Sequence, residues 1–270
     1  MKRLLSTFLF SLSGIIVLLF FLYSLMWYLV AKQTQKQIDA LWQNAANSGV
    51  QISGEKPIVG GYPSPPTIHF EGKILDSQGI EWTIPSFELL GFFVPGQVLY
   101  AELPKGATIS GEDLPEKKIN ITAAALRVRL PEDLPMSLRE ESIKEWQKNN
   151  GSIAIEWISL VAPPLGFDGN GTIGLDEKLQ ISADIPLQIK GVDVLIANLT
   201  ERKIITGKEA LMVQGLAQVL NEKDPETGEP IMNANLSIQK RGVFIGPMRI
   251  ATLQQIVWPW EKAAQSSPSP

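Results

Sequence analysis

IHFEGKILDSQGIEWTI, residues 68–84, is the stretch that best indicates how most of this chain folds. Ile68, Phe70 and Ile74 alternate with polar residues, and the alternation resumes at Ile80 after the turn signal Asp-Ser-Gln-Gly. Such a period of two is typical of strands that bury one face, and the short polar interval favours a tight connection between them. The stretch therefore predicts two antiparallel neighbours in a sheet.

Further runs with strand character follow along the chain. They are Val98–Leu103, Ile119–Leu130, Ser152–Val161, Thr172–Leu175, Leu179–Ile189, Met232–Gln239 and Val243–Ile250. In the first of these, Val98 and Tyr100 alternate with residues that are also apolar, so we expect that strand to be buried on both faces. Asp168-Gly169-Asn170-Gly171 is predicted to be a plain hairpin turn. The short connections favour a meander of mostly antiparallel strands.

Two helical stretches interrupt the strands. Leu138–Asn149 is one, and Val192–Arg202 followed by Lys208–Asn221 forms a predicted helical hairpin whose leucines could cover an open sheet face. The simplest assembly is an α+β domain over residues 50–262, with a large, curved, mostly antiparallel sheet and a few covering helices. The tail, residues 263–270, is rich in Ser and Pro and is expected to be disordered.

The beginning of the chain is apolar. Leu4–Ala31 carries no charge, and about 20 apolar residues suffice to cross a bilayer as a helix. A cleaved signal peptide also begins with basic residues, but its apolar core is about 7–15 residues long, which is roughly half of this run. We therefore predict that residues 1–31 form a cytoplasmic start and an uncleaved anchor, with Trp27 and Tyr28 near the headgroups.

The basic start favours an N-terminus in the cytoplasm, because Lys2 and Arg3 precede the apolar run, although the charge bias is slight. The rest of the chain would then lie on the exported side. Residues 32–49 are predicted to form a helical stalk. Its apolar stripe packs on the following domain in one interpretation and forms a dimerising coil in the other; the stripe consists of Ile38, Leu41, Trp42 and Ala45.

Composition excludes several kinds of chemistry. The chain has 270 residues, no Cys, one His and a formal net charge of -4. It therefore has no thiolate nucleophile or thiolate metal site, and it lacks the basic surplus usual in nucleic-acid binders. His69 is expected to be an exposed strand residue, since no nucleophile motif accompanies it. We expect no catalytic residue, no cofactor and no metal, and hydrolase activity is the least favoured function.

Large apolar side chains are dense along the predicted strands. An open sheet with an apolar concave face could hold acyl chains. The alternative is that helices cover this face as an ordinary core. The candidate apolar ligand surface consists of Trp82, Phe92, Phe93, Tyr100 and Trp157.

Three segments resemble a family of alphaproteobacterial, membrane-anchored, exported proteins known only as a domain of unknown function. They are Gly60-Gly61-Tyr62-Pro63, the block Gln97–Pro104, and the closing pattern Leu236–Met248 with its turn glycine, apolar strand and Gly-Pro. Ser64-Pro65-Pro66 departs from the aromatic and basic residues that usually follow the first segment. The resemblance implies an inner-membrane protein with a periplasmic β-rich domain and no assigned catalytic residues.

The overall pattern is also loosely similar to long β-meander envelope proteins that move or buffer lipids. From these observations we expect a non-enzymatic, inner-membrane-anchored periplasmic protein that binds lipid or a hydrophobic partner. The alternative is a structural or assembly scaffold that recruits envelope proteins through a sheet edge.

Overall fold

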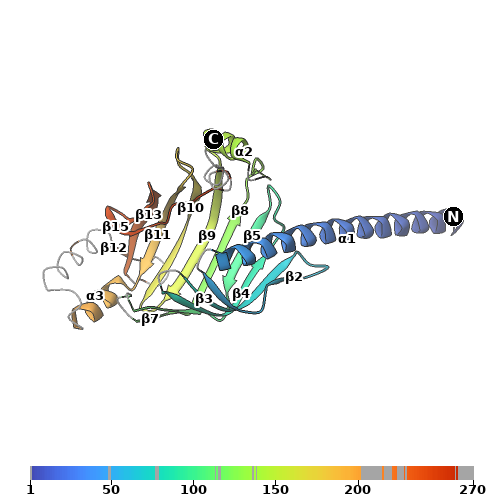
Figure 1. The fold of residues 1–270 in the computed structure, drawn as a ribbon. Helices are drawn as coiled ribbons and strands as arrows, with labels where there is room; N and C mark the ends of the chain where they lie inside the picture. Colours follow the sequence, from blue (N-terminus) through green and yellow to red (C-terminus); the bar gives the residue numbers. More distant parts are fainter. Residues whose placement is uncertain are drawn as a thin grey trace, which may run out of the picture.

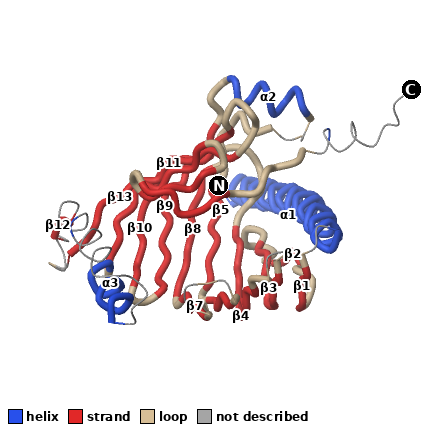
Figure 2. Tube along the Cα trace, turned by 60° about the vertical axis from the view of Figure 1, so that its left-hand side comes forward, coloured by secondary structure: helices blue, strands red, loops and turns tan. Residues whose placement is uncertain are grey.

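The computed structural model describes residues 2–47, 50–76, 79–112, 114, 117–135, 137, 139–201, 215, 221–223, 228, 230–258 and 260. Within them lie three helices and one sheet of 15 strands. The sheet is open and strongly curved, and α1 projects from it as a long rod (Figures 1 and 2). This agrees with the predicted α+β fold with a β-rich domain.

Most of the longer strands overlap the predicted runs. The helices are α1 (Lys2–Asn47), α2 (Glu140–Lys148) and α3 (Val192–Glu201). The strands in the first half of the sheet are β1 (Gln51–Gly54), β2 (Ile58–Gly60), β3 (Thr67–Leu75), β4 (Glu81–Leu90), β5 (Val98–Leu103), β6 (Ala107–Ser110), β7 (Lys118–Ile121) and β8 (Ala123–Arg129). Those in the second half are β9 (Ser152–Ala162), β10 (Leu165–Leu175), β11 (Ile181–Lys190), β12 (Asn221–Lys223), β13 (Pro230–Gln239), β14 (Gly242–Ile245) and β15 (Met248–Thr252). The short strands β2, β6 and β12 were not predicted.

The sheet is a meander, as its short connections predict. Its main path runs β1-β3-β4-β5-β8-β9-β10-β11-β13-β14-β15, and every ladder among the described strands is antiparallel. The short strands β6 and β7 form a side excursion in which β6 pairs with β4. Among the described strands, β1 and β15 therefore form the two ends of the path.

Period-two alternation gives the sheet two chemically different faces. One row of register partners is apolar throughout and consists of Ile68, Leu89, Ala101, Leu126, Ile158, Gly169, Leu187 and Ala234. The neighbouring row is almost entirely polar and consists of His69, Glu88, Glu102, Ala125, Ser159, Asp168, Gln188 and Asn233. Register partners share a face, and successive residues point to opposite faces. We call the first row's side the inner face and the second row's side the outer face.

The hydrophobic core lies on the inner face. On β11, Ile185 and Ile189 are each 3% exposed, whereas the intervening Pro186 and Gln188 on the outer face are exposed. The buried residues of β11 pack with Ile155 of β9 and with partly buried apolar residues of neighbouring strands. The curved sheet thus buries inner-face side chains against one another.

α1 is a single helix that continues without interruption from the apolar run into the predicted stalk. Residues Ile16–Ala40 are long and apolar enough to cross a membrane. The second half of α1 lies beside β1 and β2. It is this part of α1 that covers the sheet, whereas α2 and α3 lie at opposite ends of the strands (Figure 2).

The prediction of a hairpin turn at Asp168–Gly171 is wrong. These residues lie inside β10, and the reversal occurs earlier, at Pro163-Pro164 between β9 and β10. A Cβ atom on Gly169 would collide with the carbonyl of Pro186, and one on Gly171 with that of Asp184, both on β11. The two glycines therefore permit the close approach of β10 and β11, and they flank the register shift between β10 and β9. Glycines in this role resemble a turn signal in the sequence.

Two predicted strands are each divided in the structure. The run Ile119–Leu130 breaks at Thr122, so that β7 pairs with β6 while β8 pairs with β5 and β9. The run Val243–Ile250 breaks at Gly246-Pro247, which turns the chain between β14 and β15. The second half of the predicted helical hairpin and the predicted disordered tail lie almost wholly outside the described residues.

Candidate functional site

A cavity of about 550 Å³ lies between the second half of α1 and the inner face of β1–β4. The helix contributes Ile38, Trp42 and Ala45 as its roof, and the sheet contributes apolar residues that include Phe70 and Phe87. The Trp42 and Phe70 rings meet edge to face, with centroids 6.1 Å apart. The stripe that the sequence shows on the stalk thus packs over the sheet, and it leaves space beneath it.

A second apolar hollow of about 300 Å³ continues this cavity across β4, β5, β8 and β9. Its inner-face lining includes Trp82, Ala124 and Leu160. Ile84 and Phe87 of β4 line both spaces, which therefore adjoin one another. We call the two together the inner groove. Apolar clefts of a few hundred Å³ are the usual size for sites that hold small apolar ligands.

Polar contacts along one side fasten the roof to the sheet. Gln35 of α1 donates from Nε2 to the Pro57 carbonyl at 3.1 Å and accepts at Oε1 from the Val59 N–H at 2.9 Å. Beside it, Lys56 forms an ion pair with Asp39 at 2.8 Å. These contacts hold α1 by its polar side, so its apolar stripe remains directed at the groove.

Two of the five residues predicted for the apolar ligand surface line the inner groove. Trp82 lies on the inner face of β4 and is 36% exposed, and Phe93 lines the space under α1. Phe92 is half-buried in the connection between β4 and β5, where its carbonyl accepts from the Val94 N–H at 2.8 Å.

Tyr100 and Trp157 were predicted to belong to the same apolar surface, but in the structure they lie on the outer face. Arg127 of β8 pairs in register with both of them, so all three share that face. On β5, Leu99 and every second residue after it point inward, whereas Tyr100 points to the polar outer face. The strand therefore does not have an apolar environment on both of its faces, as the sequence had led us to expect. Size and aromaticity alone did not separate the two faces, whereas strand register does.

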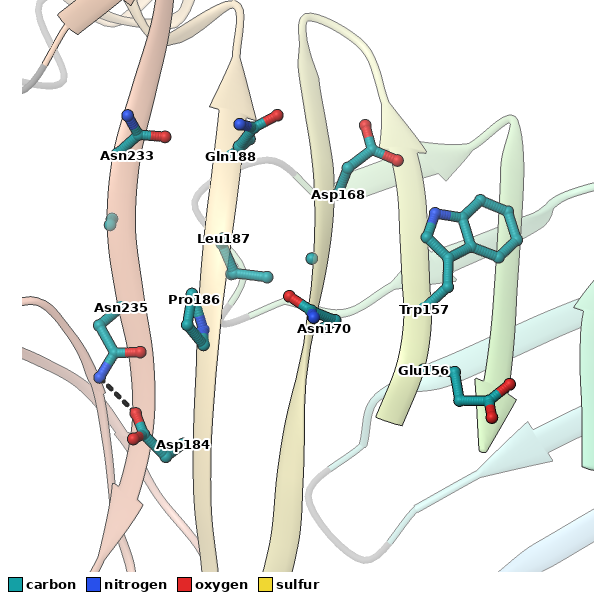
Figure 3. Close-up of a pocket in the computed structure, with 12 residues that line it drawn as sticks. Glu156, Trp157, Asp168, Asn170, Asp184, Pro186, Leu187, Gln188, Asn233 and Asn235 are labelled. Atoms are coloured by element: carbon teal, nitrogen blue, oxygen red, sulfur yellow. Dashed lines mark hydrogen bonds between the residues drawn. The ribbon is translucent and has the colours of Figure 1, made fainter. Parts of the chain in front are cut away.

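The outer face carries a polar hollow of about 730 Å³ across β9, β10, β11 and β13 (Figure 3). Asn235 donates to Asp184 there at 2.6 Å, and Trp157 is 40% exposed. The adjacent Glu156 pairs with Arg127 at 2.7 Å and Arg129 at 2.6 Å. The exposed amides and paired charges of this hollow are typical of a solvated surface, in contrast to the inner groove.

The outer face also contains a hydrogen bond between two residues of β5. The Tyr100 hydroxyl donates to Glu102 Oε2 at 2.8 Å. This bond raises the pKa of Tyr100, and partial burial and the nearby negative charge act in the same direction. His69, predicted to be an exposed strand residue, is exposed on this face.

Several groove residues were noticed in the sequence but not assigned to a ligand surface. Ile84 and Phe70 belonged to recognised strand alternation, and Trp42 to the stalk stripe. The sequence could have indicated these residues through the alternation of inward and outward side chains along each strand, combined with the apolar stripe of the stalk helix. The stripe indicated packing on the domain as one interpretation, but the sequence did not indicate which strands α1 covers.

Comparisons with known proteins place the chain at the level of a family. The model of a family described as "Uncharacterized protein conserved in bacteria (DUF2125)" matches residues 96–254, which is more than half of the chain. The match contains the block Gln97–Pro104 and the closing pattern Leu236–Met248. No significant match was found among curated proteins or among solved structures.

Proposed function

The chain belongs to the uncharacterised bacterial family DUF2125, and from that premise we propose that it is a non-enzymatic, membrane-anchored protein that holds a lipid in its inner groove. The observation that carries the proposal is the groove itself. It is lined almost entirely by apolar side chains, and it lies under the helix that would anchor the chain.

Physical chemistry supports an acyl chain as the occupant. A groove of aliphatic and aromatic carbon offers water no hydrogen bonds. Transfer of a methylene group from water into such an environment is favourable by about 0.8 kcal/mol. Trp82 stays 36% exposed on the inner face, so a ligand there would remove further apolar surface from water. Phospholipids and glycolipids supply such chains in an envelope.

The location that we propose is the bacterial inner membrane, with the N-terminus in the cytoplasm and the β-rich domain in the periplasm. The support is the charge-free run Leu4–Ala31 and the basic residues that precede it. In this arrangement the groove lies next to the membrane, because the first part of α1 would span the bilayer and its second half covers the groove.

Two neighbouring alanines offer a matched test. Ala124 lines the inner groove from β8, whereas Ala123, the preceding residue, is exposed on the outer face. Native mass spectrometry of the full chain released from detergent micelles would count the lipids that it retains. We expect Ala124→Trp to remove a lipid that both the original chain and Ala123→Trp keep. Equal lipid retention by the two variants would contradict lipid binding in the groove.

The alternative function is a scaffold that recruits an envelope protein through a sheet edge. What favours it is the open sheet, whose path ends among the described strands at β1 and β15. Strand addition uses such an edge. A folded full chain that retains no lipid, and whose β15 cross-links to another envelope protein, would favour this function over the first.

A further inference from the structure

The connection between β2 and β3, residues 61–66, contacts α1 within its apolar run. Tyr62 lies edge-on to Trp27, with ring centroids 5.3 Å apart, and its hydroxyl is 2.7 Å from Ser24 Oγ. The Trp27 indole donates to the Ser64 carbonyl at 2.8 Å. We call residues 61–66 the tip. Figure 1 shows β2 and the tip beside α1, toward its N-terminal half.

The backbone of the tip has few polar groups left to solvate. Its three prolines have no N–H, so only Tyr62 and Ser64 carry one within residues 62–66. All four carbonyls from Pro63 to Pro66 accept hydrogen bonds, from Tyr23, Trp27, Thr67 and the Gly91 N–H respectively. Pairing of these four carbonyls lowers the cost of a water-poor environment, where each unpaired group would cost several kcal/mol.

The side chains around the tip suit the same environment. Residues 57–68 contain no charged residue. Ile58 on the outer face of β2 is 73% exposed, and Tyr62 is 45% exposed. Ile58 lies at the border of this uncharged stretch, where Glu55, Lys56 and Glu71 line the same hollow. Tyr62 lies against Phe20 of α1, which is 57% exposed.

When the span is counted from Leu4, where the charge-free run begins, the bilayer surface falls at this level. A helix rises 1.5 Å per residue, so about 20 residues cross the hydrocarbon layer. About 20 residues counted from Leu4 reach Tyr23, yet the charge-free run continues to Ala31. The tip contacts α1 where this count ends, and Tyr and Trp side chains favour the headgroup layer.

We propose that the tip rests in the headgroup layer of the bilayer, so that the domain contacts the membrane through residues 58–66 as well as through its anchor. The proposal rests on the anchor in the proposed function, but not on lipid in the groove. Its consequence is that the inner groove is held in one orientation against the membrane surface, since the tip and the groove roof both grip α1.

Single cysteines test the proposal directly, because the chain has none of its own. The full chain, with Ser64→Cys or Ser110→Cys labelled with NBD, is reconstituted in vesicles of phosphatidylcholine and phosphatidylglycerol. Ser110 pairs with Glu81 at the end of β4 distant from the tip and serves as the control. Quenching by a headgroup nitroxide and by aqueous iodide is compared for the two sites.

We expect headgroup nitroxide to quench the Ser64 probe at least about twofold more than the Ser110 probe, with iodide giving the reverse order. In the same vesicles, Ile58→Asp should reduce the nitroxide quenching at Ser64. Val194→Asp, at an apolar site on α3 that is 48% exposed, should not. Equal iodide access at Ser64 and Ser110, or no effect of Ile58→Asp, would overturn the proposal.

The failures of the two proposals are distinguishable. Flotation of the vesicles reports the anchor, and protein that does not float overturns both the anchor and the membrane contact of the tip. Floating protein with an iodide-accessible tip overturns only this inference. Loss of the difference between Ala124→Trp and Ala123→Trp overturns only lipid binding in the groove.

Discussion

The two faces of one sheet, rather than two domains, form the main contrast in this molecule. Inner- and outer-face residues alternate on the same strands and share the same backbone hydrogen bonds. One position along each strand separates Ile158 from Ser159, and Leu187 from Gln188. The inner face accumulates apolar side chains under α1, whereas the outer face carries amides, acids and paired arginines.

This contrast teaches that an open sheet can have a core without a full second layer. Curvature brings inner-face side chains of β9, β11 and β13 into one cluster, and the second half of α1 covers β1–β4. Between these two parts lies the hollow lined by Trp82, Ala124 and Leu160, which is apolar and accessible. A soluble surface seldom exposes such a stretch unless something binds there.

The largest expected effect comes from a truncation in the inner-face cluster. Ile185→Ala should lower the free energy of unfolding by about 2–5 kcal/mol, because it leaves a cavity at a site that is 3% exposed. Urea unfolding of the full chain, followed by Trp fluorescence, measures the change. The outer-face control Gln188→Ala should stay within about 0.5 kcal/mol. Equal losses at the two sites would contradict the assignment of the faces.

A smaller effect is expected where α1 is fastened over the groove. Gln35→Ala removes the acceptor of the Val59 N–H and the donor to Pro57, and each bond is worth about 1 kcal/mol. Hydrogen exchange at the Val59 amide should therefore accelerate about fivefold. Gln43→Ala, an exposed site on the same helix, is the control. Unchanged exchange at Val59 would show that the roof does not depend on Gln35.

The smallest expected effect is on the outer face, at Tyr100. Its raised pKa means that the native state binds this proton more tightly than the unfolded chain does. The resulting stabilisation is present below the ordinary tyrosine pKa of about 10, and it is lost as the pH rises through the folded value. Glu102→Gln should lower the Tyr100 pKa, as measured by NMR of its ring carbon, whereas Glu88→Gln should change it less. An unchanged pKa in Glu102→Gln would contradict the assigned cause.

Much of the fold could be predicted because half-buried strands leave a strong local record. The hairpin at residues 68–84 became β3 and β4, and the turn glycine of the closing pattern, Gly242, begins β14 directly after the turn Lys240-Arg241. The errors arose where one residue type serves two purposes. Gly169 and Gly171 resembled a turn but relieve crowding against β11, and the reversal came from Pro163-Pro164 instead.

The candidate site was predictable only in part. Trp82 and Phe93 line the inner groove, whereas Tyr100 and Trp157, which were assigned to the same surface on aromatic character alone, lie on the outer face. A face is a property of register across strands, and β-bulges shift that register within β4 and β9. Long-range pairing of this kind leaves no periodic trace within a single strand.

The sequence by itself determined the apolar N-terminal helix, the meander of strands and the absence of cysteine chemistry. Composition and short-range periodicity carry that information, because they reflect the solvent that each residue prefers. Only the tertiary structure decided that α1 covers β1–β4 and that the tip clasps α1 near Trp27. These contacts join segments far apart in the chain through shape and hydrogen-bond complementarity, which no local pattern encodes.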